Sequence, residues 1–360
     1  MKRLLVAIIL LLAVPTPASA DQNQIYLATP ANRNYEGELT NKVFESSLAP
    51  NGEIGFPVFQ SNASNTGERI WIIDGALLDD VQYLIAQDST LASSWLDRLK
   101  RAVGNSNSVY ATAYGNPDVR YLQSLAPSEL SFYYDYGQFR VAEILGRGVR
   151  SEKGSGLASK RANISNELRQ FFNSARQEFV LLSTVIDPKE IEFERAKLGQ
   201  LFNPLLDSKE RDELLSNYQS GERKFLSKLR IVSGRYQITT ANQKMPITLV
   251  NEFESPAKVD LLFKPLNNRV VFPEYRGITL APKSKIQVSV PIKTIAAGDT
   301  TVIARFENGK GKLVGATAIL DLTSAIISPA VTRFTTGAGL VLILAAIAQS
   351  VRRIRKSRAS

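Results

Sequence analysis

The sequence predicts an α+β multidomain protein: a reduced α/β (partial barrel-like) and helical region, then an antiparallel immunoglobulin-like β-sandwich, then one C-terminal transmembrane helix. Three observations lead to this prediction. Short apolar runs alternate with helical patterns up to residue 234. From Tyr236 the hydrophobic period changes to two, as in strands with one buried face. An uncharged apolar stretch followed by a basic tail closes the chain.

These patterns predict six segments. They are a signal peptide (1–20), a polar N-terminal segment (21–66), an α/β and helical domain (67–234), the sandwich (235–322), a transmembrane helix (334–351) and a basic cytoplasmic tail (352–360). The 360 residues are enough for two ordinary domains with terminal segments.

The N-terminus has the three parts of a secretory signal peptide. Lys2 and Arg3 give a positive start, and the apolar run from Leu4 to Val14 is too short to span a bilayer. The small residues that end at Ala20 predict cleavage before Asp21. The alternative is an uncleaved N-terminal anchor.

Residues 334–351 form the second membrane signal, because these 18 residues carry no charge. As a helix they span about 27 Å, close to the hydrocarbon thickness of a bilayer. Five cations follow, which are Arg352, Arg353, Arg355, Lys356 and Arg358. The positive-inside rule therefore predicts a single-pass protein of the cell membrane, with the N-terminal ectodomain outside and the tail in the cytoplasm. The alternative is a buried core helix.

The residue types that are missing narrow the chemistry. The chain has no cysteine and no histidine. Disulfides, thiol nucleophiles, Ser-His-Asp triads and sites built on Cys or His ligands are therefore excluded. We expect no cofactor and no metal. The net charge of +10 resides mostly in the two ends, so we also expect no nucleic-acid partner.

Before the sandwich, apolar runs and helical spacing alternate. The polar segment 21–66 is expected to form loops, apart from one strand at 24–28. The predicted α/β elements are a strand at 69–74, a helix at 76–86, a helix capped by Ser93 or Ser94 and ended by Gly104, a strand at 108–113, a turn at 114–118 and a helix at 119–125. Helices are then predicted at 130–145, at 164–186, at about 188–202, and from a capping box at Asp207 and Glu210 to Gly234.

Eight short runs separated by turn residues predict the sandwich. They are 236–240, 247–251, 259–264, 270–272, 278–280, 286–292, 300–306 and 314–320. No Cys…Trp…Cys framework is present, so a true immunoglobulin domain is excluded.

Two acids lie where a catalytic pair could form. Asp74 ends the first strand and Asp118 lies in the turn after the second, and strand ends hold the active sites of α/β folds. They could be the acid and base of a glycosidase. The alternative, which we favour, is that each caps the helix that follows it.

Tyrosines cluster in the same region, with Tyr110 and Tyr114 nearest to the strand end. Their rings could stack on sugars, or they could pack half-buried with the hydroxyl exposed. Trp71 and Trp95 lie on predicted apolar faces and are expected in the core.

Several passages carry a family resemblance. Pro246–Pro256 and Ile278–Pro291 resemble a strand pair and hairpin of one family, while Trp71–Leu78 and Tyr110–Asp118 resemble its "D-P-x-L-L" and "P-Y-x-D-P-D" segments. The chain is similar to an uncharacterised actinobacterial family of membrane-anchored envelope proteins, a domain of unknown function commonly encoded beside an MviN-type lipid flippase. The resemblance implies a place in the envelope and a link to peptidoglycan synthesis or export.

These observations favour a non-catalytic scaffold or binding module on the outside of the membrane. Its expected partners are the membrane, a cell-wall glycan or an envelope-synthesis protein. Two alternatives stay open: a carbohydrate-active hydrolase that uses Asp74 and Asp118, and a protein whose sandwich alone is an adhesive module.

Overall fold

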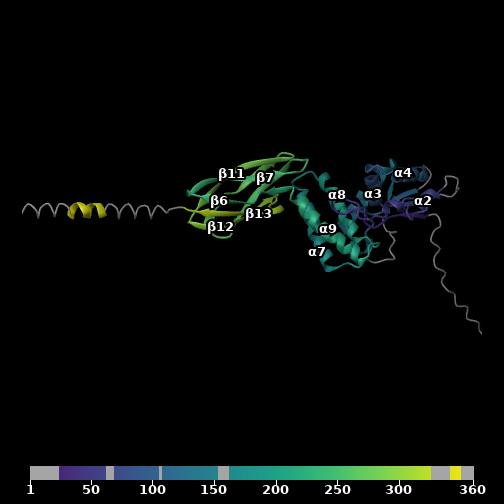
Figure 1. Ribbon diagram of the computed structural model, residues 1–360, viewed down its shortest axis with the longest axis horizontal. Coiled ribbons are helices and arrows are strands. Elements are labelled where there is room, and N and C mark those ends of the chain that lie inside the picture. Colours follow the sequence, from purple (N-terminus) through teal and green to yellow (C-terminus); the bar gives the residue numbers. More distant parts are fainter. Residues whose placement is uncertain (1–23, 62–68, 105–107, 153–161, 326–340, 350–360) are drawn as a thin grey trace, which may run out of the picture. The chain divides into compact units, whose positions relative to one another are not determined.

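The computed structural model describes residues 24–61, 69–104, 108–152, 162–325 and 341–349 (Figure 1). The predicted signal peptide, its cleavage site between Ala20 and Asp21, and the basic tail lie outside the described residues. The chain divides into two compact units, each described by itself. Residues up to 165 together with 196–215 form the first unit, and residues 166–195 together with those from 216 onward form the second.

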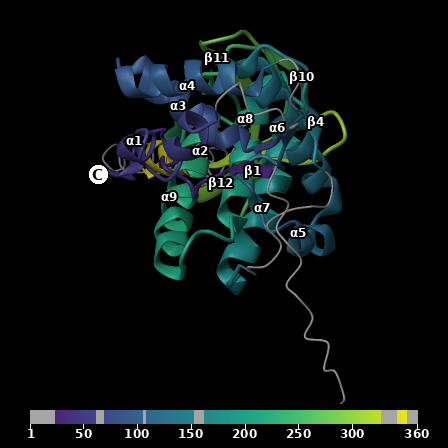
Figure 2. The same ribbon diagram turned by 90° about the vertical axis from the view of Figure 1, so that its right-hand side faces the viewer.

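A parallel sheet organises the first unit. Its four strands follow one another in chain order: β1 (Gln24–Leu27), β2 (Ile70–Ile73), β3 (Ser108–Ala111) and β4 (Arg150–Ser151). Parallel sheets are covered on both faces, which explains the continuous apolar run of β2. The connections between the last three strands contain α3 (Gly75–Ala86), α4 (Thr90–Val103), α5 (Val119–Leu125) and α6 (Pro127–Leu145) (Figure 2). The predicted strands at 69–74 and 108–113 are confirmed.

The core of this unit contains both tryptophans. Trp71 and Trp95 are fully buried, as predicted. The polar N-terminal segment adds two short helices, α1 (Phe44–Ser47) and α2 (Gly55–Phe59), and it buries Phe44, Leu48 and Val58 in the same core. The expectation of loops is wrong here, because helices of one turn show no sequence period and owe their stability to packing.

Two predicted helix boundaries are also wrong. The Ser89 hydroxyl accepts the Ala92 N–H at 3.1 Å, so α4 begins one turn before Ser93. The last helix does not reach Gly234. It is α9 (Ser208–Leu226), and the residues beyond it form a strand, β5 (Leu229–Ile231). Leu229 and Ile231 alternate with a polar residue, as in a strand. Phe225, Leu229 and Val232 are also spaced by four and three, as on a helix face, so the sequence alone favoured a helix here.

The remaining helices match the pattern more closely. They are α7 (Asn166–Leu182), α8 (Lys189–Lys197) and the 3-10 helix η1 (Leu198–Phe202). The capping box before α9 is confirmed. The Asp207 N–H donates to Glu210 Oε2 at 3.0 Å, and the Glu210 N–H donates to Asp207 Oδ1 at 2.8 Å.

A two-sheet sandwich forms most of the second unit. One sheet has the order β10-β8-β12-β13-β6 and the other β5-β7-β11-β9. The strands are β6 (Gly234–Ile238), β7 (Asn242–Asn251), β8 (Ala257–Pro265), β9 (Val270–Val271), β10 (Tyr275–Leu280), β11 (Ser284–Thr294), β12 (Gly298–Glu307) and β13 (Leu313–Ser324). All pairs are antiparallel except β6 with β13. The eight predicted strands are therefore confirmed, and β5 is added.

Helical residues belong to the same unit as the sandwich. The Lys258 N–H donates to the Val185 carbonyl at 3.0 Å, and the Asn308 amide donates to the Thr184 hydroxyl at 2.9 Å. The compact units therefore do not divide at residues 234 and 235, where the change of hydrophobic period suggested a boundary.

A helical segment lies near the C-terminus. Residues 341–349 are helical and their side chains are exposed, with Leu342 at 70%. Within the described parts of the chain, no helix is long and apolar enough to cross a membrane. The rest of the predicted span 334–351 lies outside the described residues.

Candidate functional site at the carboxyl edge of the parallel sheet

The strands of the first unit all end at one edge of the sheet, because they are parallel. Asp74 follows β2, Thr112 follows β3 and Glu152 follows β4. Ligands of α/β proteins bind at this edge, since the loops there converge while the strands hold them in place. The polar groups at this edge are therefore the candidates for function.

Asp74 is a helix cap with a second structural contact. Its Oδ1 accepts the Ala76 N–H of α3 at 3.0 Å and the Gly115 N–H at 2.9 Å. The residue is 1% exposed, and Oδ2 has no hydrogen-bond partner in the part of the chain that the structure describes. Burial raises the pKa of Asp74 to about 7, although the two N–H donors oppose the shift.

Asp118 is also a cap. Its Oδ1 accepts the Tyr121 N–H of α5 at 3.0 Å, and its Oδ2 accepts the Ala162 N–H at 3.3 Å. The capping interpretation of both acids is therefore what the structure shows. Each carboxylate is held by backbone donors, and the described hydrogen bonds include none between the two side chains.

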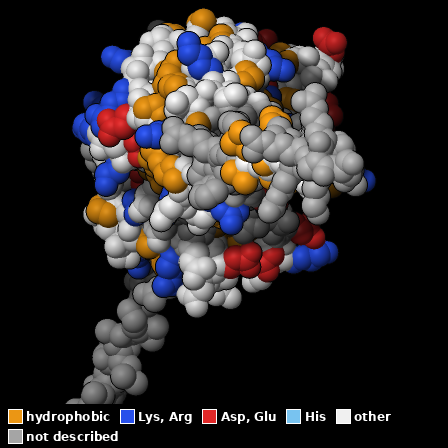
Figure 3. Space-filling view, turned by 90° about the vertical axis from the view of Figure 1, so that its left-hand side faces the viewer, with side chains coloured by type: hydrophobic (Ala, Val, Ile, Leu, Met, Phe, Trp, Pro, Cys, Tyr) orange, Lys and Arg blue, Asp and Glu red, His pale blue; other side chains and the backbone are white. Residues whose placement is uncertain are grey.

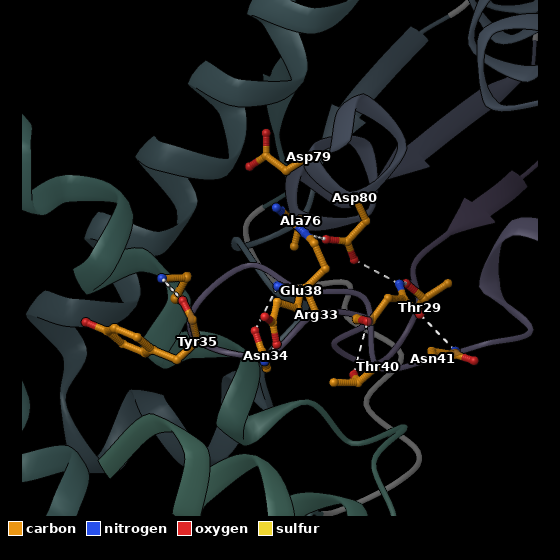
Figure 4. Close-up of polar contacts among 12 residues, drawn as sticks. Thr29, Arg33, Asn34, Tyr35, Glu38, Thr40, Asn41, Ala76, Asp79 and Asp80 are labelled. Atoms are coloured by element: carbon orange, nitrogen blue, oxygen red, sulfur yellow. Dashed lines mark hydrogen bonds and ion pairs between the residues drawn. The ribbon is translucent and has the colours of Figure 1, made fainter. Parts of the chain in front are cut away.

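Two further acids, which no sequence motif singled out, lie on α3. Asp80 accepts from Arg33 Nε at 2.6 Å and from Asn32 Nδ2 at 2.9 Å, and Figure 4 shows this carboxylate pointing toward Arg33. Asp79 points away from them in Figure 4, accepting from the Tyr114 hydroxyl at 2.7 Å and from Arg140. The only sequence signal for these contacts was a pair of adjacent acids in an otherwise apolar helix.

The two ion pairs have structural consequences. Asp80 fastens the segment after β1 to α3, and Asp79 joins α3 to α6. Tyr114 is 1% exposed, and its ring makes an edge-to-face contact with the ring of Tyr136, with 5.1 Å between the ring centroids. A ring so deeply buried presents no face to a sugar. Tyr110 is half-buried, with its hydroxyl 3.5 Å from Arg150 Nη1.

A small open pocket remains at this edge, with a volume of about 10 Å³, which is room for about one water molecule. Strand ends and the turn after β3 form its wall. The lining residues are Tyr26, Thr112, Ala113, Asn116, Pro117, Val119, Tyr134 and Glu152. The sequence predicts the turn here but not the pocket, since β4 has only two residues and leaves no period to read.

Asn116 supplies one polar group of the pocket. It has a left-handed φ of 47° and is 5% exposed. Its Oδ1 accepts the Tyr26 hydroxyl at 2.9 Å, while Nδ2 has no partner among the described residues. Gly115 before it has a φ of 78°, and a Cβ there would come within 2.6 Å of Gln200 Cγ. Glycine is therefore the residue that fits this position of the turn.

Glu152 supplies the second polar group of the pocket. Its N–H donates to the Ala111 carbonyl at 2.9 Å, which continues the pairing of β3 with β4. The residue is 8% exposed, and Oε1 has no partner within the described chain. Burial raises the pKa of Glu152 to about 7. The pocket thus combines an unpaired amide donor with an unpaired carboxyl oxygen.

This pair of groups suits a hydrogen-bonded ligand. No three acidic side chains among the described residues come together as a metal ion requires. A carboxyl and an amide that line one pocket offer an acceptor and a donor, and a hydroxyl group can pair with groups of both kinds.

The fold defines a class: an α+β protein with a unit built on a parallel sheet and a unit built mostly on an antiparallel, immunoglobulin-like two-sheet sandwich. The chain belongs to a family of unknown function, DUF6049, whose model matches residues 90–359. A search of the curated proteins finds no match.

Three solved structures are each similar to about a quarter of the chain. WR4, an MSP family member of C. elegans, is 13% identical at a TM-score of 0.22, covering 28% of this chain and 99% of its own. A PapD-like domain of human CEP192 is 12% identical at a TM-score of 0.21, and the match covers 28% of this chain and 88% of that domain. The E. coli chaperone DraB is 11% identical at a TM-score of 0.20, and the match covers 27% of this chain and 53% of DraB. Scores this low carry no functional argument.

Proposed function

We propose that the chain is a single-pass cell-envelope protein whose first unit is a non-catalytic binding module for a hydroxyl-rich ligand, a cell-wall glycan. The observation that carries the proposal is that Asn116 and Glu152 line one pocket, and that each has a buried polar atom, Nδ2 and Oε1, without a partner among the described residues. An unpaired buried polar group costs about 1–3 kcal/mol, so a ligand that pairs both groups recovers that cost.

The size of the pocket suits part of a ligand. A cavity of about 10–15 Å³ holds one water molecule, and this pocket has a volume of about 10 Å³. It therefore takes one small substituent of a larger molecule, such as a single hydroxyl group of a sugar. Tyr26 lines the same pocket, and its half-buried ring adds aromatic surface beside it.

The aspartates near the sheet edge already have structural partners, which favours binding over hydrolysis. A glycosidase needs two carboxyl groups that reach the substrate, but Asp74 and Asp118 serve as caps, and Asp79 and Asp80 pair with arginines. One observation favours the hydrolase alternative: Asp74 has a pKa of about 7 and an unpaired Oδ2. Asp74 is not among the residues that line the pocket, which argues against access by a substrate.

The ends of the chain support display on a membrane. The N-terminal signal pattern, the uncharged stretch 334–351 and the cations that follow predict export and retention. The exposed apolar side chains of residues 341–349 suit a lipid environment. The envelope resemblance adds peptidoglycan synthesis or export as the setting.

Pull-down of the full chain on purified cell-wall glycan tests the binding module. Glu152→Gln removes the carboxyl, and Asn116→Asp removes the donor while keeping a residue type that tolerates positive φ. Both should lose glycan binding. Asp135→Asn, at an exposed position on α6, removes the same charge and should bind like the wild type. Wild-type protein that ignores the glycan, or Glu152→Gln protein that still binds it, would contradict the proposal.

Protease treatment of intact protoplasts tests the topology. Digestion should remove everything except the anchor and the tail. An ectodomain that stays fully protected would refute display on the outer face, whatever the result of the glycan experiment.

A further inference from the structure

One end of the sandwich exposes large apolar side chains. Leu266 is 61% exposed, Ile295 is 62% and Val271 is 48%. Backbone contacts place them at this end. The Ile295 N–H donates to the Arg269 carbonyl at 2.7 Å, Val271 pairs with Lys293, and the Leu266 N–H donates to the Thr301 carbonyl at 2.9 Å, near the start of β12. Soluble surfaces seldom gather such side chains without a partner.

Cations accompany these apolar residues. Lys264, Arg269 and Lys293 are exposed at the same end, and so is Asp299, whose backbone carbonyl accepts from Arg269 Nη1 at 3.1 Å. Figure 3 looks at this end and shows hydrophobic side chains in orange beside lysine and arginine side chains in blue. The combination of exposed apolar tips and positive charge suits an anionic lipid surface.

The opposite end of the sandwich has a different character. There Arg230 pairs with Glu252 at 2.7 Å and Lys283 pairs with Glu254 at 2.9 Å. The turn at 308–311 is polar, and Asn308 contacts Thr184. Exposed apolar side chains beside cations are therefore a feature of the first end of the sandwich and are not shared by the opposite end.

The chain leaves the sandwich at the apolar end. β13 ends at Ser324, which pairs with Gly298 at the start of β12. Only the eight residues 326–333 separate Ala325 from the predicted span 334–351. Fully extended, eight residues reach at most about 30 Å. A sandwich on so short a connection presents this end to the bilayer.

We propose that this end, formed by Leu266, Val271, Ile295, Lys264, Arg269 and Lys293, is a bilayer-contact surface that seats the sandwich on anionic lipid. The proposal rests on the membrane anchor of the proposed function. It adds that the sandwich touches the lipid itself instead of standing clear of it.

Lipid quenching of a single fluorescent label tests the contact. Because the chain has no cysteine, each introduced cysteine is a unique labelling site. Ile295→Cys marks the proposed contact. Gly309→Cys marks the opposite end, where an added side chain meets no atom within 4 Å. The labelled full chains are reconstituted into vesicles of phosphatidylglycerol and phosphatidylcholine that contain lipids with a quencher on the acyl chain.

The label at 295 should be quenched severalfold more than the label at 309. The label at 295 should also be quenched less in vesicles of phosphatidylcholine alone than in vesicles that contain phosphatidylglycerol. Equal quenching at both positions, in protein that floats with the vesicles, would overturn the contact while leaving the anchor intact. Protein that does not float with the vesicles would overturn both. Contact between labels at 295 that persists in detergent would mean that a second copy covers this end, which also refutes the proposal.

Discussion

Replacing Asp74 with asparagine should stabilise the first unit in a pH-dependent way. The carboxyl is 1% exposed, and burial raises its pKa from 3.8 to about 7. Asparagine caps helices as well as aspartate does, and its amide oxygen can accept the same N–H donors from Ala76 and Gly115. The substitution therefore removes the buried titration while keeping the cap.

The sign follows from the direction of the shift. Because the pKa is higher in the folded than in the unfolded chain, the wild-type carboxyl favours folding most at low pH. That contribution is lost as the pH rises from about 4 through 7. One pKa unit corresponds to about 1.4 kcal/mol, so the whole shift is worth about 4 kcal/mol. The difference in unfolding free energy, Asp74→Asn minus wild type, should rise by about that amount up to pH 7 and then level off.

Urea unfolding followed by tryptophan fluorescence measures this difference. Trp71 and Trp95 are the only tryptophans and both lie in the first unit, so the signal reports that unit alone. Asp118→Asn controls for the loss of a charge at a capped helix. Asp74→Ala should instead destabilise the unit by about 1–3 kcal/mol for each N–H left unpaired. A difference between Asp74→Asn and wild type that stays constant from pH 4 to 8 would refute the reasoning.

Three further predictions concern single elements. A segment of residues 227–325, measured by circular dichroism, should melt at a higher temperature than a segment of 236–322, which lacks β5. The reason is that Leu229 and Ile231 of β5 are 0% and 4% exposed, and burial of each side chain contributes about 1.5–3 kcal/mol. Burial, and then the charge of Glu178, raise the pKa of Glu222 to about 7, so Glu222→Gln should raise the calorimetric melting temperature of the second unit more at pH 8 than at pH 5. Tyr114→Phe should cost about 1–3 kcal/mol by leaving Asp79 a donor short, yet leave glycan binding unchanged; a loss of binding at full stability would contradict the packing role of Tyr114.

The sandwich could be predicted from the sequence because each strand alternates. Along β12, Val302, Ala304 and Phe306 point inward and are fully buried, while the residues between them are partly exposed. A period of two sustained along a whole strand is typical of a sheet with one buried face. The caps at Asp74 and Asp118 were also predictable, since each acid stands directly before an apolar helical pattern.

The pocket could not be predicted in the same way. Asn116 and Glu152 are 36 residues apart in the chain, and they line one pocket because β3 and β4 are adjacent. β4 has only two residues, and its place is set by pairing rather than by propensity. The same holds for Asp80, whose partner Arg33 lies in a segment without a recognisable period. Contacts between distant segments leave no local signal in a single sequence.

The pH dependence of binding separates the two ways in which the pocket can hold a hydroxyl group. Asn116 Nδ2 can only donate, so the oxygen of the ligand hydroxyl accepts from it. The O–H of the ligand then donates a hydrogen bond to the Glu152 carboxylate. A donated hydrogen bond favours the ionised carboxylate, whose pKa is about 7 before the ligand binds. Binding then releases a proton, and glycan affinity should increase from pH 5 to about 7 and become constant above it. Glu152→Gln should abolish this dependence together with most of the binding. Affinity that falls as the pH rises would mean that the protonated acid donates to the ligand, and the assignment of donor and acceptor in this pocket would be reversed.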